Sequence, residues 1–182
     1  MALWIARHAT PLIASGVCYG ALDVTADAQH TLQAAHALAQ GLPVQCKVWV
    51  SPLQRCIQLA DAMSGIRPEL KPQIDTRLRE MDFGSWEGVA WDAIPLAAMQ
   101  GWTDDFGAHR FGGVESANEV LTRVADVWDA ARQHSDKDQV WITHAGVARA
   151  AKLLSQGIRR VDSASQWPKE SPGYGEWSIF SL

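Results

Sequence analysis

The sequence predicts an α/β fold, a three-layer sandwich with a mostly parallel central sheet and helices on both faces. Three short runs are rich in β-branched or aromatic residues, as expected of strands that are buried on both faces: Leu3–Ala6, Lys47–Val50 and Val140–Thr143. Gln73–Thr76 and Glu176–Phe180 are weaker strand candidates. Amphipathic segments with helix caps lie between these strands, and this alternation is typical of a parallel sheet.

The first two predicted helices lie on either side of the second strand. Thr25 is placed to cap a helix that Gly41 and Pro43 end. Ser51-Pro52 gives an N-cap followed by proline at the first helical position, which predicts a second helix. The residues expected to face inward are Ala28, Leu32, Ala35 and Ala39 in the first helix, and Leu53, Cys56, Ile57 and Ala60 in the second.

Two further helices are predicted in the second half of the chain. Ser116 and Glu119 have the spacing of a capping box, which marks the start of a helix. The last helix is expected over residues 145–156, and Gly157 ends it. The helix after the capping box has a clear apolar stripe, formed by Val120, Val124, Val127, Trp128 and Ala131.

Length and composition indicate one globular domain spanning residues 1–182. The chain has 47% hydrophobic and 20% charged residues, which is ordinary for a globular protein. A net charge of −4 argues against a nucleic-acid partner. Neither a signal peptide nor a membrane span is predicted, so we expect a cytoplasmic protein without a membrane partner. A homodimer is left open as an assembly.

The cysteines and histidines do not predict a metal site. Cys18, Cys46 and Cys56 are odd in number and lack CxxC spacing, which favours reduced thiols in the cytosol. The six histidines include no pair at helical ligand spacing. We therefore expect no metal and no cofactor.

Most of the nine tryptophans are expected to be structural. Trp86, Trp91 and Trp102 have a second interpretation, because they lie in a region punctuated by glycine and aspartate and could form the wall of a pocket. The tryptophans inside the predicted strands are Trp4, Trp49 and Trp141.

Charged and imidazole side chains follow the predicted strands. The carboxyl ends of parallel strands share one edge of the sheet, where open α/β folds bind ligands. Five residues should therefore converge there, although they span most of the chain: Arg7, His8, Arg55, Glu80 and His144. Two arginines, two histidines and a carboxylic acid in one pocket form a set suited to binding phosphate.

Each of these residues also has a structural interpretation. His8 could be a hydrogen-bonded histidine at a strand end, and Arg55 a solvated helix residue. His144 could simply precede a helix. Glu80 has two rivals for the role of the acid, Asp82 and Glu87. The residues alone do not say which histidine would attack a phosphate.

Four ordered segments resemble the histidine phosphatase superfamily, which is also called phosphoglycerate mutase-like. The first resembles an apolar strand ending in Arg-His-Gly, and the second a Ser-Pro-Leu-x-Arg segment. The third resembles Glu-x-x-Phe-Gly-x-Trp-Glu-Gly, and the fourth a closing Thr-His-Ala/Gly-Gly. The segments are residues 3–9, 50–56, 78–88 and 140–146.

Within that superfamily the chain looks most like the α-ribazole phosphatase branch, through residues 18–23 and 112–116. It departs from the branch pattern in several places. Ala21 replaces the usual arginine, Val114 interrupts the Gly-Glu link, and Ala9 replaces the glycine beside the histidine. No asparagine follows at the usual phosphate-contact position, where Thr10 could supply a hydroxyl group instead.

The resemblance implies a phosphatase that forms a phosphohistidine on His8. Arg7 and Arg55 would hold the phosphoryl oxygens, with His144, expected to be protonated beside the bound dianion, as a third positive contact. Glu80 would protonate the leaving alcohol and then activate water. The expected substrate is a small phosphate ester, in the closest case α-ribazole 5′-phosphate.

Substrate contacts are also expected from Thr10, Tyr19 and Ala145. Two alternatives remain at this point. One is a catalytically weak module of the same fold that binds phosphate esters, and the other is a phosphoglycerate-type mutase.

Overall fold

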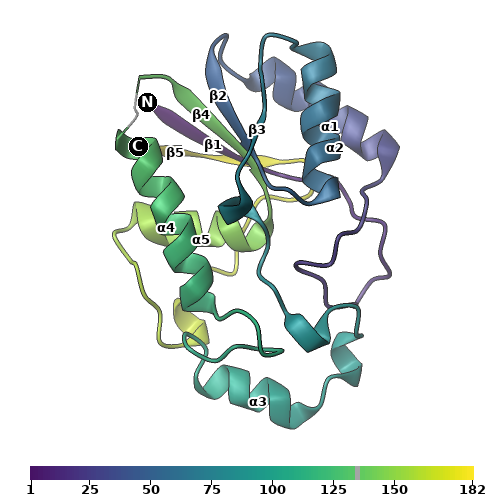
Figure 1. The fold of residues 1–182 in the computed structure, drawn as a ribbon, viewed down its shortest axis with the longest axis vertical. Coiled ribbons are helices and arrows are strands. Elements are labelled where there is room, and N and C mark those ends of the chain that lie inside the picture. The colour runs from purple at the N-terminus through teal and green to yellow at the C-terminus, as the bar shows by residue number, and fades with distance from the viewer. Residues whose placement is uncertain (134–135) are drawn as a thin grey trace.

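The computed structural model describes residues 1–133 and 136–182 and contains a five-stranded sheet with the order β3-β2-β4-β1-β5 (Figure 1). Strand β1 pairs in parallel with β4, β4 with β2, and β2 with β3, whereas β5 runs antiparallel to β1. The strands are β1 (Ala2–Arg7), β2 (Cys46–Val50), β3 (Gln73–Ile74), β4 (Asp138–Thr143) and β5 (Trp177–Ser181). The predicted α/β fold with a mostly parallel sheet is confirmed.

Strand β3 is shorter than the predicted Gln73–Thr76, because the chain turns at Asp75. The Asp75 carboxylate accepts the backbone N–H of Arg77, 2.9 Å away, and pairs with the Arg77 guanidinium at 2.7 Å. This turn starts the segment that leads to Glu80.

Helices cover both faces of the sheet. The helices are α1 (Ala28–Gly41), α2 (Gln54–Ile66), α3 (Leu96–Asp104), α4 (Ala117–Gln133) and α5 (Ala145–Ser155). Helices α1 and α2 share a core with alternate strand residues, and α4 and α5 share a second core with the residues between them. Ala6 and Val140 face the first core, whereas Ile5 and Trp141 face the second. Because both faces are covered, β1, β2 and β4 each contain a run of consecutive apolar residues.

Helix α1 begins later in the chain than its predicted cap. Asp27, and not Thr25, is the N-cap, and its carboxylate accepts the backbone N–H of His30 at 2.7 Å. The predicted inward residues Ala28 and Leu32 are exposed. The buried stripe is Thr31, Ala34, Ala35, Leu38 and Ala39, so only Ala35 and Ala39 were predicted correctly.

Helix α2 begins at Gln54 with Leu53 at the N-cap position, so the prediction that Ser51 is the N-cap was wrong. Ser51 instead lies buried at the end of β2, where its hydroxyl contacts a histidine. Leu53 and Ile57 are half-buried. The buried face of α2 consists of Arg55, Cys56, Leu59, Ala60 and Met63.

The predictions for the two later helices are confirmed. The Ser116 N–H donates to the Glu119 carboxylate at 2.9 Å, and the Glu119 N–H donates to the Ser116 hydroxyl at 3.3 Å, which is a capping box. The five predicted stripe residues of α4 are buried. Helix α5 ends at Ser155, and Gly157 follows with φ of +80°, a conformation that favours glycine.

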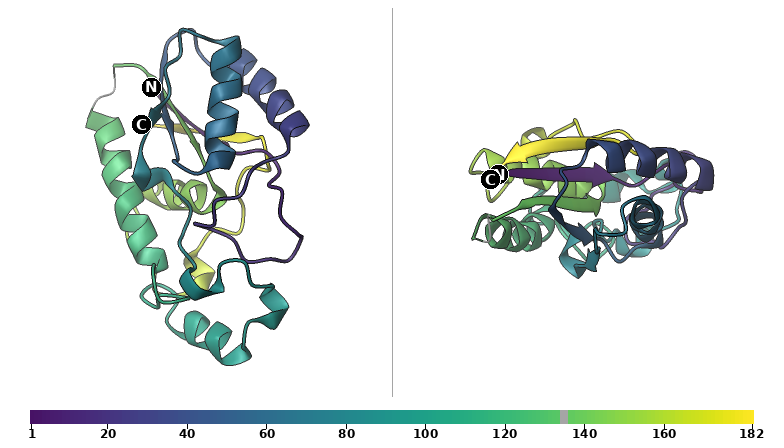
Figure 2. Two further views of the ribbon diagram at one scale, coloured as in Figure 1. Left: turned by 45° about the vertical axis from the view of Figure 1, so that its right-hand side comes forward. Right: turned by 90° about the horizontal axis from the view of Figure 1, so that it is seen from above.

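The segment that contains α3 extends beyond the sheet as a separate lobe of short helices and turns (Figures 1 and 2). Its interior is a cluster of aromatic rings around Phe111, and Phe111 itself is fully buried. Of the three tryptophans predicted to lie in strands, Trp141 is fully buried, whereas Trp4 and Trp49 are half-buried. No helix in the described part of the chain is long and apolar enough to cross a membrane.

Candidate active site

A cavity of about 380 Å³ lies at the carboxyl edge of the sheet, and four of the five predicted residues line it. Arg7 is the last residue of β1, with His8 directly after it, and Arg55 comes from the first turn of α2. Glu80 lies on the segment that follows β3. His144 does not line the cavity, but its ring centroid lies 5.1 Å from that of His8. The five residues therefore converge as the parallel strands predicted.

His8 is held as a neutral imidazole whose Nε2 lone pair accepts a hydrogen bond from Arg55. Its Nδ1 lies 2.7 Å from the carbonyl oxygen of Ala9. A carbonyl can only accept a hydrogen bond, so Nδ1 carries the proton and Nε2 keeps its lone pair. Burial, and then the positive charge of Arg55, lower the pKa of His8 from 6.5 to about 3. The nucleophilic form is therefore the one present at neutral pH.

Arg55 is fully buried, yet its guanidinium is well supplied with acceptors. Its Nε donates to Nε2 of His8 at 3.3 Å. Its two terminal nitrogens donate to the carbonyl oxygens of Leu22 at 2.8 Å and Gly20 at 2.6 Å. These carbonyls fix the plane of the guanidinium beside the nucleophile, which suits it to hold two phosphoryl oxygens.

Glu87 shapes the loop that supplies those carbonyls. One of its carboxylate oxygens accepts the backbone N–H groups of Gly20 and Leu22, at 2.8 and 3.0 Å. The other accepts those of Ala21 and Phe83, each at 2.9 Å. The loop therefore points N–H groups at Glu87 and carbonyl groups at Arg55. Sequence reasoning considered Glu87 only as a rival acid, because nothing local indicates this link.

Arg7 lies against Tyr174. Its guanidinium carbon lies 3.9 Å from the ring centroid of Tyr174, a cation–π contact, and one terminal nitrogen donates to the carbonyl of Pro172 at 3.1 Å. The hydroxyls of Tyr174 and Tyr19 lie 2.7 Å apart. Tyr19 lines the cavity, as predicted for a substrate contact, and Tyr174 is an additional member that the sequence did not indicate.

His144 is fully buried next to Ser51, whose hydroxyl lies 2.8 Å from its Nε2. Burial, and then the positive charge of Arg55, hold the pKa of His144 well below its ordinary value of 6.5. His144 is therefore neutral in the protein without a ligand, and its protonation beside a bound dianion stays a prediction. Only a bound dianion would favour the charged form. Cys56 lies beside the same ring, with its Sγ 3.4 Å from Nε2.

Glu80 is held against the start of α5. Its carboxylate accepts the backbone N–H groups of Met81 and Gly146, each at 3.0 Å. A Cβ atom on Gly146 would lie 2.2 Å from Glu80 Oε1, so the glycine is what allows this approach. The rival acids lie elsewhere: Asp82 accepts the N–H of Gly84, and neither Asp82 nor Glu87 lines the cavity.

The segment carrying Glu80 is anchored from two sides. The hydroxyl of Thr143, at the end of β4, donates to the carbonyl of Leu78 at 2.6 Å. Arg123 of α4 donates to the carbonyls of Arg77 and Arg79, each at 2.7 Å. Arg123 is itself held by a partly buried ion pair with Glu115 at 2.7 Å. These anchors are distant in sequence, so no local pattern predicted them.

Two other predicted contacts have different outcomes. Ala145 lines the cavity. Thr10 does not, and the prediction that its hydroxyl contacts the substrate is corrected: the hydroxyl lies 2.7 Å from Nδ1 of His30, on the exposed start of α1. Trp91 and Trp102 line the cavity, whereas Trp86 packs against Phe111 and does not.

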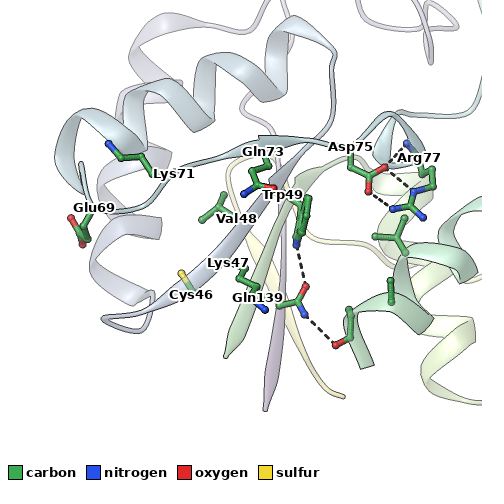
Figure 3. A pocket seen from close by; sticks show the side chains of 13 residues that line it. Cys46, Lys47, Val48, Trp49, Glu69, Lys71, Gln73, Asp75, Arg77 and Gln139 are labelled. Carbon is green, nitrogen blue, oxygen red and sulfur yellow. Dashed lines mark hydrogen bonds and ion pairs between the residues drawn. The ribbon is translucent and has the colours of Figure 1, made fainter. Parts of the chain in front are cut away.

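A larger cavity, of about 530 Å³, lies along the edge of the sheet beside β2 and β3 (Figure 3). Two of its charged groups pair with residues outside the lining, Lys47 with Asp136 and Glu69 with Arg67. Arg77 pairs with Asp75, and Trp49 donates from its indole nitrogen to Gln139 at 3.2 Å. Among the described residues, no histidine lines this cavity. In residues 1–133 and 136–182, no group of three or more His, Cys, Asp or Glu side chains could hold a metal ion.

Comparison with known proteins identifies the family of this chain. Residues 3–167 match the histidine phosphatase superfamily (branch 1). The chain is 31% identical over 153 residues to a glucosyl-3-phosphoglycerate phosphatase of Mycolicibacterium vanbaalenii, a match that covers 77% of this chain and 64% of that relative's length.

The fold is also similar to solved structures. A mycobacterial glucosyl-3-phosphoglycerate phosphatase has a TM-score of 0.80 at 22% identity, covering 98% of this chain and 88% of that one. Protein TTHB049 of Thermus thermophilus has a TM-score of 0.72 at 26% identity, covering 98% and 92%. The family match spans most of the sequence, and the chain belongs to the histidine phosphatase superfamily.

Proposed function

We propose that the protein is a metal-independent phosphomonoester hydrolase that works through a phosphohistidine on His8. The observation that carries this proposal is the neutral His8 imidazole, whose Nε2 lone pair lies beside the Arg55 guanidinium at 3.3 Å in a cavity also lined by Arg7 and Glu80. A neutral, positioned nucleophile between two fixed cations is what attack on a phosphate dianion requires.

In the first step, Nε2 of His8 attacks phosphorus while the bond from phosphorus to the ester oxygen breaks. Arg7 and Arg55 bind the non-bridging oxygens and offset their charge as the group is transferred. The carboxylic acid of Glu80 gives its proton to the leaving oxygen, so an alcohol departs and the Glu80 carboxylate remains. The two arginines supply the charge stabilisation, so no step requires a metal.

In the second step, the Glu80 carboxylate takes a proton from water, and the resulting oxygen nucleophile attacks the phosphohistidine. The bond from phosphorus to Nε2 breaks, and inorganic phosphate is released with His8 again neutral. The same carboxylate can serve both steps because it lies on the wall of the cavity, fixed by the N–H groups of Met81 and Gly146. His144 would position the phosphoryl group and gain charge only while the dianion is bound.

Two substrates are the first to test. The sequence pattern around residues 18–23 favours α-ribazole 5′-phosphate, while the relative from M. vanbaalenii is a glucosyl-3-phosphoglycerate phosphatase. The chain aligns with only 64% of that relative's length, so its substrate is a candidate here and no more.

The test is to trap the intermediate. The purified protein is mixed with a ³²P-labelled phosphate ester, quenched at alkaline pH, which preserves phosphohistidine, and digested to locate the label. We expect the label on the peptide that contains His8, with none in the His8→Ala variant. The His144→Ala variant should still be labelled, about 10²–10³-fold more slowly, as when one charge-stabilising donor is lost.

Two results would contradict the proposal. Label on the peptide containing His144 would reverse the assignment of the nucleophile. Tight binding of vanadate without any phosphohistidine or turnover would indicate a module that only binds phosphate esters.

A further inference from the structure

The part of the cavity beyond the phosphate-binding residues is walled by aromatic rings. The rings come from the lobe around α3 and from the segment after α5, which lie far apart in sequence. All of them except Phe106 are only partly buried by the protein, so a face or edge of each remains open. The wall consists of Phe83, Trp91, Trp102, Phe106 and Trp167.

The wall is braced from behind. Trp102 stacks on the buried Phe111 with ring centroids 4.4 Å apart and planes 16° apart. Trp91 also stacks on Phe111, at 6.1 Å and 7°, and the two indoles are nearly parallel, 9° apart. Phe83 meets both indoles edge-on, at 79° and 75°. Flat rings held in this way are preorganised to receive another flat group.

The polar groups of the cavity are concentrated at the phosphate-binding end. Among the described residues that line it there is no serine, threonine, asparagine, glutamine or lysine. Arg149 is the one cation outside the predicted site residues in this lining, and its guanidinium donates to the carbonyl of Lys169 at 3.2 Å. A sugar or glycerate would meet few polar groups here beyond Arg149, whose Nε, like Nε1 of Trp102, has no hydrogen-bond partner among the described residues. Any of its hydroxyl groups left unpaired would cost free energy.

We propose that the substrate is the phosphate ester of an alcohol that carries a flat aromatic group, with Trp91 and Trp102 as the residues that select it. This inference rests on the proposed phosphatase function and names the leaving group for it. The aromatic group would lie against the wall while the phosphate sits between Arg7 and Arg55. Such an ester differs from a glycerate-type substrate, whose carboxylate and hydroxyl groups find few polar partners on the aromatic wall.

The test compares esters that differ only beyond the reacting atoms. The four substrates are ethyl phosphate, 2-phenylethyl phosphate, 2-cyclohexylethyl phosphate and 3-phosphoglycerate. Burying a phenyl group should raise kcat/KM about 10-fold or more over ethyl phosphate. Ring-on-ring contact should favour the phenyl ester about 3-fold over the cyclohexyl ester, which is more apolar but puckered. We expect kcat/KM for 3-phosphoglycerate to be lower than that for 2-phenylethyl phosphate by about 10-fold or more.

Variants then locate the selecting residues. Trp102→Leu and Trp91→Leu keep an apolar side chain but remove the flat face, so the ratio of kcat/KM between the phenylethyl and ethyl esters should fall towards one. Trp86→Leu is the matched control, because Trp86 lies in the same lobe, 5.9 Å from Phe111, but does not line the cavity. Its ratio should stay at the value of the parent protein.

A binding measurement separates this inference from the proposed function. In the His8→Ala protein, which lacks the nucleophile, calorimetry should show 2-phenylethyl phosphate binding about 10-fold more tightly than ethyl phosphate. An active enzyme with no preference among the esters, or with a preference for 3-phosphoglycerate, overturns the aromatic leaving group but leaves the phosphatase intact. Absence of turnover and phosphohistidine with every ester overturns the proposed function instead, and the calorimetry still tests the wall.

Discussion

Replacing Glu87 with glutamine should weaken phosphate binding, although Glu87 does not line the cavity. Its carboxylate accepts four backbone N–H groups, two on each oxygen. A glutamine keeps one acceptor oxygen and points an NH₂ group at the other two donors, so at least two hydrogen bonds to a charged group are lost. At about 1.5 kcal/mol each, the lower end of the usual range, the cost is about 3 kcal/mol of stability. For a chain of this size that corresponds to a fall in Tm of about 6–12 °C.

The effect should reach the site through Arg55. The N–H groups released in the variant belong to the loop whose carbonyls, on Gly20 and Leu22, hold the Arg55 guanidinium. A loosened guanidinium binds a tetrahedral oxyanion less well, and we expect the Kd for vanadate to rise about 10-fold, or about 1.4 kcal/mol. Calorimetry well below the Tm of each protein measures this.

A double-mutant cycle tells positioning apart from a general loss of stability. In an Arg55→Ala background, Glu87→Gln should have little further effect on the vanadate Kd, because the residue through which it acts is gone. Glu119→Gln is the control: Glu119 caps α4 and pairs with Arg110 on the surface, so the change should lower the Tm and leave the Kd alone. Additive effects of Glu87→Gln and Arg55→Ala on Kd, or an unchanged Kd in Glu87→Gln, would refute the reasoning.

Three further predictions follow from the same geometry. Glu80→Gln should slow phosphoenzyme formation far more with an alkyl phosphate than with p-nitrophenyl phosphate, because p-nitrophenolate leaves without a proton. With p-nitrophenyl phosphate the variant should release a burst of one phenolate per active site. Equal impairment with both esters would show that another residue is the acid. Vanadate at 100 times its Kd should stabilise the protein by about 2.7 kcal/mol, which is measured as a rise in Tm. EDTA should leave the activity unchanged. Activity that is lost on adding EDTA and restored by zinc or magnesium would rule out the metal-independent mechanism. The folded state holds the pKa of His8 at about 3 and that of His144 well below 6.5, so the unfolded chain binds more protons than the folded chain below pH 6.5. The contribution of these histidines to stability is therefore complete above pH 6.5 and falls as the pH drops towards 3. The loss is up to about 1.4 kcal/mol per pH unit for each histidine. Urea titrations at several pH values should show that the free energy of unfolding falls less steeply with decreasing pH in a His8→Gln/His144→Gln variant. An equally steep fall would contradict the assignment of this pH dependence to the two histidines.

The sequence alone determined the order of the five strands and of helices α1, α2, α4 and α5, whereas α3 was not predicted. It also determined which strand ends carry Arg7, His8 and His144, because these features depend on periodicity along one segment. It also placed the capping box of α4, a signal that spans only Ser116 to Glu119. Local patterns were less reliable where two caps compete within a few residues. Thr25 and Asp27 are both good N-caps, and the choice between them rotates the helix and decides whether Leu32 is buried or exposed.

Only the tertiary structure decided how these residues are held. The contact from Glu87 to the loop before Arg55, the anchoring of Glu80 by Arg123, and the stacking of Trp91 and Trp102 into one wall join segments that are distant in sequence. A side chain can make such a contact only where a distant segment has unpaired backbone N–H or C=O groups. A local sequence pattern does not predict where those unpaired groups lie. The sequence therefore predicts which segments form helices and strands. Which residues hydrogen-bond to one another across segments, and which residues line the cavity, is determined only when the layers pack together.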